Sequence, residues 1–144
     1  TKHAPPHDLL QLTGGSIGIG IPLALGAAIA CPDRKVIALQ ADGSGMYTVQ
    51  GLWSQVRENC NITTVILANR RYQILHGELA NVGGGPPGVN ANRMFNLDNP
   101  EINWTALAKS LGMPAIRVDC AAELAKELKK AVAHEGPYLI EAMI

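Results

Sequence analysis

The sequence carries no excess of either charge, because its 12 lysine and arginine residues balance its 12 aspartate and glutamate residues. Without a basic field, the chain has no electrostatic reason to bind nucleic acid or an anionic membrane surface. No apolar run reaches the roughly 20 residues of a membrane-spanning helix, and glycine and proline interrupt the richest apolar region, 17–30. The composition excludes a membrane-spanning protein and predicts neither nucleic acid nor a membrane as a partner.

Cysteine is scarce as well, since the chain has only Cys31, Cys60 and Cys120. An odd number of distant cysteines is not the pattern of a disulfide scaffold, and the first residues lack the pattern of a secretory signal. We therefore expect reduced thiols in a cytoplasmic protein, with Cys60 in the core. With 144 residues, of which 47% are hydrophobic, the chain can bury a core as one domain, 1–144.

Segments with strand patterns alternate along the chain with segments that have helical spacing. Strands are predicted over 35–41, 63–68, 115–118 and 138–144, and helices over 22–30, from about 47 to 56, over 73–80, from 104 to 111 and after 119. Such alternation predicts a three-layer α/β/α domain with a mainly parallel sheet.

The same patterns predict details of packing. Strand 35–41 is apolar on both faces, so both faces should be covered. Segment 81–100 contains the run GGGPPG and is interpreted as a mobile loop. Asp119 is expected to cap the last helix. Trp53 and Trp104 are expected in the core or at an interface, and the apolar residues Leu124, Leu128 and Val132 of the last helix are expected to be buried.

One short stretch, ALQADGSGM at 38–46, places a carboxylate directly after a buried strand and before a glycine-rich turn. Asp42 could simply cap a helix. A second possibility is a dinucleotide-binding turn of the NADP type, because Gly43 and Gly45 begin a G-x-G-x-x-G pattern. The third glycine of that pattern is missing, however. A carboxylate about 4 Å from a pyrophosphate would also cost several kcal/mol.

A divalent cation removes that electrostatic objection. Mg²⁺ prefers hard oxygen ligands and commonly combines one or two protein carboxylates with phosphate oxygens. Asp42 follows one predicted strand and Asn69 follows the next, so both should lie at the same edge of the sheet. Gly43 and Gly45 would let backbone N–H groups approach the phosphates. A helix beginning near Tyr47 would point its positive N-terminal end at them. The sequence therefore predicts a magnesium-dependent diphosphate site.

At this point the sequence resembles a known family. Asp42-Gly43 followed by Asn69 resembles the thiamine-diphosphate signature, in which Gly-Asp-Gly precedes Asn-Asn by about two dozen residues. The segments 14–28 and 31–39 are also similar to the family in the same order. The resemblance covers nearly the whole chain. It points to the C-terminal, diphosphate-binding domain of enzymes such as acetolactate synthase and benzoylformate decarboxylase, which act on 2-oxo acids.

The resemblance implies a role for each matched residue. The carboxylate of Asp42, the side chain of Asn69 and the carbonyl of Arg71 would bind Mg²⁺. Ile17 would hold the two rings of thiamine diphosphate in a bent shape, and the carbonyl of Gly15 would accept a hydrogen bond from the cofactor's amine. The full set of implied cofactor-binding residues is Gly15, Ser16, Ile17, Asp42, Gly43, Ser44, Asn69 and Tyr72.

The sequence also departs from the family pattern. Ala41 and Ala68 replace the first glycine and the first asparagine of the signature, and no tryptophan follows the signature near Glu78, which argues against acetolactate synthase activity itself. The family's pyrimidine-binding domain, which supplies a catalytic glutamate, is absent from these residues.

The resemblance therefore implies a domain that binds the cofactor but is nearly inactive alone. Its expected partners are that pyrimidine-binding domain, in cis or in trans, and further copies of the chain in an oligomer. A non-catalytic module that binds the cofactor or dimerises is the alternative.

Overall fold

The computed structural model describes residues 4–144. Four strands form one parallel sheet in the order β1-β2-β4-β3. The strands are β1 (Val36–Ala41), β2 (Ile62–Ala68), β3 (Ala115–Val118) and β4 (Tyr138–Met143). The helices are α1 (Gly20–Ala30), α2 (Asp42–Met46), α3 (Gly51–Arg57), α4 (Gln73–Asn81), α5 (Val89–Phe95), α6 (Trp104–Ser110) and α7 (Ala121–Ala133).

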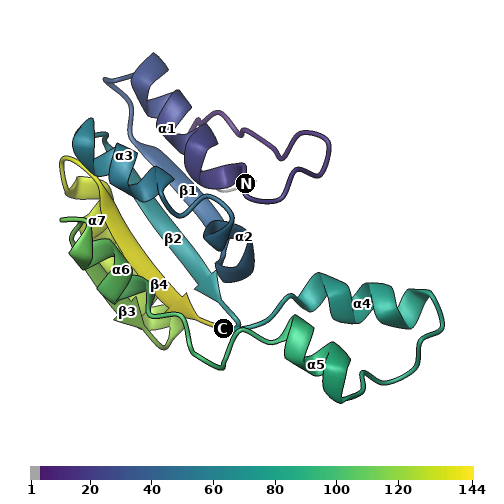
Figure 1. Cartoon of the computed structure of the whole chain (residues 1–144). Coiled ribbons are helices and arrows are strands. Elements are labelled where there is room, and N and C mark those ends of the chain that lie inside the picture. Colours follow the sequence, from purple (N-terminus) through teal and green to yellow (C-terminus); the bar gives the residue numbers. More distant parts are fainter. Residues whose placement is uncertain (1–3) are drawn as a thin grey trace.

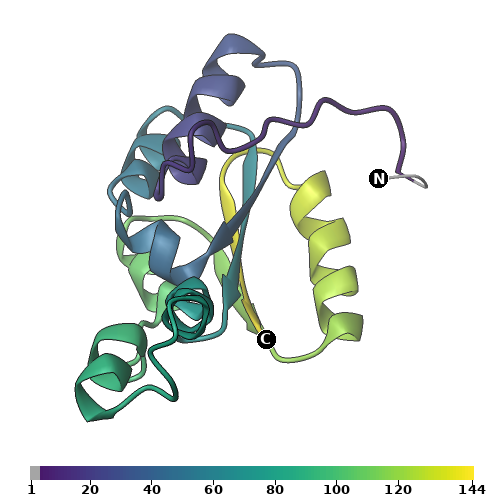
Figure 2. The ribbon, with the colours of Figure 1, turned by 90° about the vertical axis from the view of Figure 1, so that its right-hand side faces the viewer.

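Helices cover both faces of the sheet, which confirms the predicted three-layer α/β/α fold. Figure 2 shows α7 on one side of the strands, with α1 and α3 on the other. The alternation of side chains along β2 explains the layers, because Ile66 packs with residues of α1, α3 and α6, whereas neighbouring Val65 packs with residues of α7. Among the described residues, no helix is long and apolar enough to cross a membrane.

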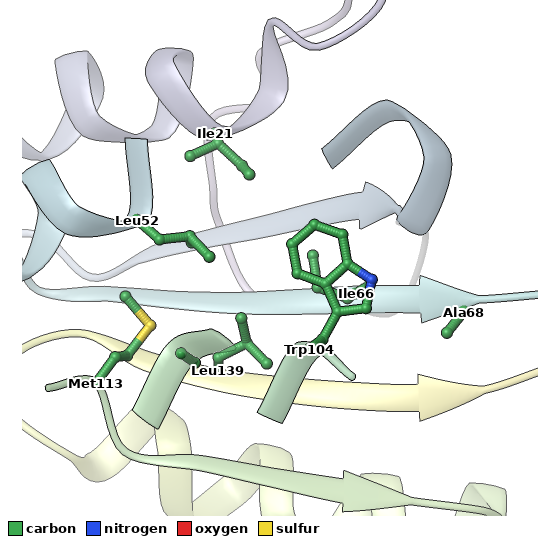
Figure 3. Packing of buried hydrophobic residues seen from close by; sticks show 8 residues of the cluster. Ile21, Leu52, Ile66, Ala68, Trp104, Met113 and Leu139 are labelled. Atoms are coloured by element: carbon green, nitrogen blue, oxygen red, sulfur yellow. The ribbon is translucent and has the colours of Figure 1, made fainter. Parts of the chain in front are cut away.

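The main core lies between the sheet and the helices α1, α3 and α6 (Figure 3). Trp104, at the start of α6, is fully buried there, as its helical spacing predicted. Trp53 is not a core residue: it is 49% exposed, and the Arg57 guanidinium lies 5.4 Å from its ring centre. Cys60 is buried in a second cluster beside α1, as predicted.

Strand β1 is covered on one face only, which corrects the prediction of two covered faces. Its side chains alternate between buried and exposed, and Ile37 and Leu39 are 47% and 70% exposed. The strand lies at the edge of the sheet, and a groove of about 630 Å³ runs beside it, walled by residues 8–10 and by α1. The uncovered face of β1 is therefore an exposed apolar surface at the edge of the sheet, where β1 pairs with no strand on its outer side.

Four local predictions differ from the structure. The helix expected from about 47 to 56 is present as α3 but begins only at Gly51, and a separate helical turn that was not predicted, α2, begins at Asp42 itself. Segment 81–100, expected to be a loop, contains α5. The residue that caps α7 is Cys120, which makes no side-chain capping bond, so Asp119 does not cap that helix. In the same helix, Val132 is 41% exposed, and Leu124 and Leu128 are only partly buried.

Helices α4 and α5 form a hairpin that stands away from the sheet (Figure 1). Neither helix has a buried residue. The base of the hairpin is held by backbone hydrogen bonds, from Tyr72 N to Phe95 O (2.7 Å) and from Leu97 N to Arg70 O (2.7 Å). The base of the hairpin is therefore the segment directly after β2, and the candidate site lies in that same segment.

Candidate functional site

Asp42 lies at the carboxyl end of β1, where it is the first residue of α2. Its side chain is buried, and each carboxylate oxygen accepts one backbone hydrogen bond. Gly43 N donates to Oδ1 (2.8 Å), and Arg70 N donates to Oδ2 (2.7 Å). Asp42 thus joins the turn after β1 to the turn after β2.

The buried carboxylate lacks a full counter-charge within the described part of the chain. Burial raises the pKa of Asp42 above its ordinary value, whereas the N–H groups of Gly43 and Arg70 act in the opposite direction. None of the ion pairs among residues 4–144 includes Asp42, and the nearby Arg70 guanidinium instead lies 3.7 Å from Glu101. A cation bound at this carboxylate would remove the electrostatic cost of its burial.

The second oxygen donor comes from the turn after β2. Strands β1 and β2 pair in parallel up to Ala41 and Leu67, so Asp42 and Asn69 follow adjacent strand ends. Asn69 Oδ1 accepts a hydrogen bond from Arg71 N (3.1 Å), which shapes the turn. Arg70 between them has a φ of 57°, a left-handed conformation that directs its N–H to Asp42.

These donors suit Mg²⁺ in kind. A carboxylate, an amide oxygen and a backbone carbonyl are hard oxygen ligands, and Mg²⁺ completes its octahedron with phosphate oxygens or water. Within residues 4–144, no cluster of three histidine, cysteine, aspartate or glutamate residues could hold a metal. A metal here would therefore depend on few protein ligands and on a bound ligand's own oxygens.

The tyrosine of the implied site packs directly on Gly43. A Cβ built on Gly43 would meet the Tyr72 ring, 2.7 Å from Cδ1, so a larger residue would displace the tyrosine. Burial raises the pKa of Tyr72, and the proximity of Tyr47 and Asp42 adds to that shift. The Tyr72 hydroxyl therefore stays protonated near neutral pH and can donate a hydrogen bond.

The glycine-rich loop before α1 reaches the same place. Gly18 N donates to Ser44 Oγ (3.0 Å), and Thr48 Oγ1 donates to Gly18 O (2.6 Å). The structure thus joins Gly18 to the turn that follows Asp42, while residues 15–17, next to it in the chain, are exposed, Ile17 by 47%. Sequence reasoning missed Gly18 and Thr48. The sequence signal for Gly18 was the repetition of glycine at 14, 15, 18 and 20, and Thr48 had none.

Comparison with known families gives one match over almost the whole chain. Residues 1–142 match the family described as thiamine pyrophosphate enzyme, C-terminal TPP binding domain. Among curated proteins, the chain is 49% identical over 145 residues to the Mycobacterium tuberculosis protein named "Putative acetolactate synthase large subunit IlvX". It is 36% identical over 129 residues, or 88% of the chain, to benzoylformate decarboxylase of Pseudomonas aeruginosa.

A solved structure agrees with these matches. The thiamine diphosphate-dependent 4-hydroxybenzoylformate decarboxylase of Rhodococcus jostii RHA1 superposes on 87% of the chain with a TM-score of 0.77 and 33% identity. The chain spans about a quarter of such proteins: all of it matches 28% of the mycobacterial relative, and it covers 23% of the Pseudomonas enzyme and 22% of the Rhodococcus one.

Proposed function

The chain belongs to the family of C-terminal TPP-binding domains of thiamine pyrophosphate enzymes, and we propose that it binds Mg²⁺ and the diphosphate of thiamine diphosphate. The observation that carries this proposal is the buried Asp42 carboxylate, which lacks an ion pair in the described chain and follows the strand adjacent to the one that Asn69 follows. A dinucleotide would place phosphates against that charge without a cation to neutralise it. Because the chain belongs to this family, we no longer consider the alternative of a dinucleotide-binding domain.

In this proposal each end of the cofactor has its own residues. Asp42, Asn69 and the Arg71 carbonyl hold Mg²⁺, while Gly43, Ser44 and Tyr72 offer donors to the diphosphate. Gly15, Ser16 and Ile17 hold the ring end, since their loop is fixed on the same turn.

When bound, thiamine diphosphate supplies the carbon nucleophile and the electron sink for cleaving or joining 2-oxo acids. The protein supplies placement of the cofactor and the charges around it. The names of two relatives, benzoylformate decarboxylase and 4-hydroxybenzoylformate decarboxylase, support a 2-oxo acid as the substrate class. We propose that the parent activity is decarboxylation or carboligation of such acids.

We further propose that these 144 residues are nearly inactive alone and work with a pyrimidine-binding domain, within an oligomer. Two apolar surfaces support a partner: the uncovered face of β1 and the unburied α4–α5 hairpin beside the site. The three cysteines are free, which supports a cytoplasmic location.

Calorimetric titration of thiamine diphosphate into the chain tests the proposal, with Mg²⁺ and with EDTA. We expect binding with Mg²⁺ only, and its loss in Asp42→Ala. Asp8→Ala is the matched control, because it removes an exposed carboxylate that pairs with Arg34. Binding that survives EDTA or Asp42→Ala would contradict the role of the metal, and no binding by the unmodified chain would contradict a binding-competent domain.

Turnover separates an enzyme domain from a non-catalytic module. The chain is mixed with the pyrimidine-binding domain of a relative, thiamine diphosphate and Mg²⁺, and loss of a 2-oxo acid is followed. An enzyme domain should give turnover that requires both chains. Cofactor binding without turnover in the mixture would favour the non-catalytic module.

A further inference from the structure

One residue of the glycine-rich loop, Gly18, is buried, unlike the residues that precede it. Residues 14–17 are exposed, whereas Gly18 is buried and uses both of its backbone polar groups in hydrogen bonds to side chains. Its N–H donates to Ser44 Oγ, and its carbonyl accepts from Thr48 Oγ1 at 2.6 Å. Both side chains come from the segment that begins at Asp42. We name this pair of contacts the Gly18 tether.

The geometry of the tether requires glycine. Gly18 has a φ of 89°, and a Cβ at this position would lie 2.7 Å from Tyr47 Cβ. The atom it would meet belongs to the start of a side chain and has little freedom to move. The backbone of the loop therefore rests directly on 44–48, at a distance that only glycine permits.

The tether leaves the proton of Ser44 free. Ser44 Oγ is the acceptor in its bond with Gly18, so its own O–H can still donate to an anion. A hydroxyl that donates to an anion becomes a better acceptor. Contact of a phosphate with Ser44 would therefore strengthen the hydrogen bond from Gly18 N to Ser44 Oγ.

From these contacts we propose that Thr48, acting through Gly18, is a positioning residue that fixes the loop of Gly15 and Ile17 over the Asp42 turn. This inference rests on the proposed function. Thr48 touches neither end of the cofactor in this arrangement. It sets the separation between the residues that would hold the rings and those that would hold the diphosphate.

The first test needs no cofactor. Amide exchange of Gly18 is followed by NMR in the unmodified chain and in Thr48→Val, Thr48→Ser and Thr63→Val. Thr63→Val is the matched control, because Thr63 Oγ1 also donates to a backbone carbonyl, that of Ala131 (3.0 Å), on the other side of the sheet. We expect Thr48→Val to increase the exchange rate of the Gly18 amide roughly three- to tenfold. In Thr48→Ser and in Thr63→Val the rate should equal that of the unmodified chain. Unchanged exchange in Thr48→Val, or equal acceleration in Thr63→Val, would overturn the tether.

The second test separates positioning from general stability. Binding of inorganic pyrophosphate with Mg²⁺ is compared with binding of thiamine diphosphate with Mg²⁺. Thr48→Val should weaken thiamine diphosphate roughly three- to tenfold and pyrophosphate less than about twofold, since only the former reaches the loop. Equal weakening of both ligands, or of neither, would overturn the positioning role. If the unmodified chain binds neither ligand, the proposed function fails, and the exchange result alone decides whether Thr48 holds the loop.

Discussion

The carboxylate of Asp42 accepts a hydrogen bond from the backbone N–H of Arg70 at 2.7 Å, across a sequence separation of 28 residues. This bond joins the ends of two adjacent strands. Arg70 adopts a left-handed conformation to make it, with φ at 57°, which is uncommon for a residue with a side chain. Of the two non-glycine residues with a positive φ in the described chain, Asn59 and Arg70, the second lies at the candidate site, where its conformation holds an N–H on a buried charge.

Replacing Arg70 by glycine should relieve the strain of that conformation. A left-handed conformation costs a residue with a Cβ about 1–2 kcal/mol, but Arg70→Gly also removes the ion pair with Glu101. Arg70→Ala is the control, because it removes the ion pair and keeps the strain. We expect Arg70→Gly to unfold in urea with a free energy about 1 kcal/mol higher than Arg70→Ala. Equal free energies would show that the turn is not strained.

A second glycine is required by core packing. A Cβ at Gly45 would lie 2.8 Å from Cη2 of buried Trp104, with no room for the indole to move aside in the core. We expect Gly45→Ala to lower the free energy of unfolding by about 1–3 kcal/mol. Gly26→Ala is the contrasting control, since its Cβ would meet nothing within 4 Å in helix α1. That change should stabilise the chain by about 0.5–1 kcal/mol, and destabilisation by both variants would contradict the packing argument.

Much of this fold could be predicted because its signals are local. The β-branched run at 63–68 and the spacing of Trp104, Ala108 and Leu111 each follow from the period of one element. Asp42 and Asn69 could be predicted to lie together because the carboxyl ends of adjacent parallel strands share one edge of the sheet. Neither inference needs knowledge of the distant contacts of a side chain.

The remaining features depend on contacts between distant segments. Nothing near Thr48 indicates that its hydroxyl bonds to Gly18, which lies 30 residues away. The apolar pattern of β1 predicts that other segments cover both faces of the strand. The pattern cannot say whether those segments belong to this chain, and this chain covers only one face. Helix α5 follows a glycine- and proline-rich run that indicates a loop, and it is held at its end by a bond from Tyr72 N to Phe95 O. Tertiary context decided each of these cases.

The three thiols should differ in reactivity. Cys31 and Cys120 are exposed, whereas Cys60 is buried, and burial, with a smaller effect of nearby Glu58, raises its pKa. Because the thiolate is the reactive form, a colorimetric thiol reagent should modify two cysteines rapidly and the third only after unfolding. In Cys60→Ala the slow fraction should disappear and the rapid one should remain. Rapid reaction of all three cysteines would contradict the burial of Cys60.

The open side of β1 predicts association. Val36 N donates to Asn61 O on the side of β2, so Ile37 and Leu39 direct their backbone groups away from that strand. Leu39 is also 70% exposed on the uncovered face, and strand Val36–Ala41 itself contains no charged residue, the usual protection of an edge strand against pairing with another chain. We expect the chain alone to self-associate through this edge.

Sedimentation velocity over a range of concentrations measures that association. Leu39→Lys should raise the dissociation constant at least about tenfold, because burying a leucine side chain contributes roughly 1.5–3 kcal/mol. Val132→Lys is the control, since it places a similar charge on the exposed part of α7, where a cation in the last turn is tolerated. A chain that stays monomeric at high concentration would contradict the prediction. Equal weakening by both variants would place the contact elsewhere, because only Leu39 belongs to the open edge.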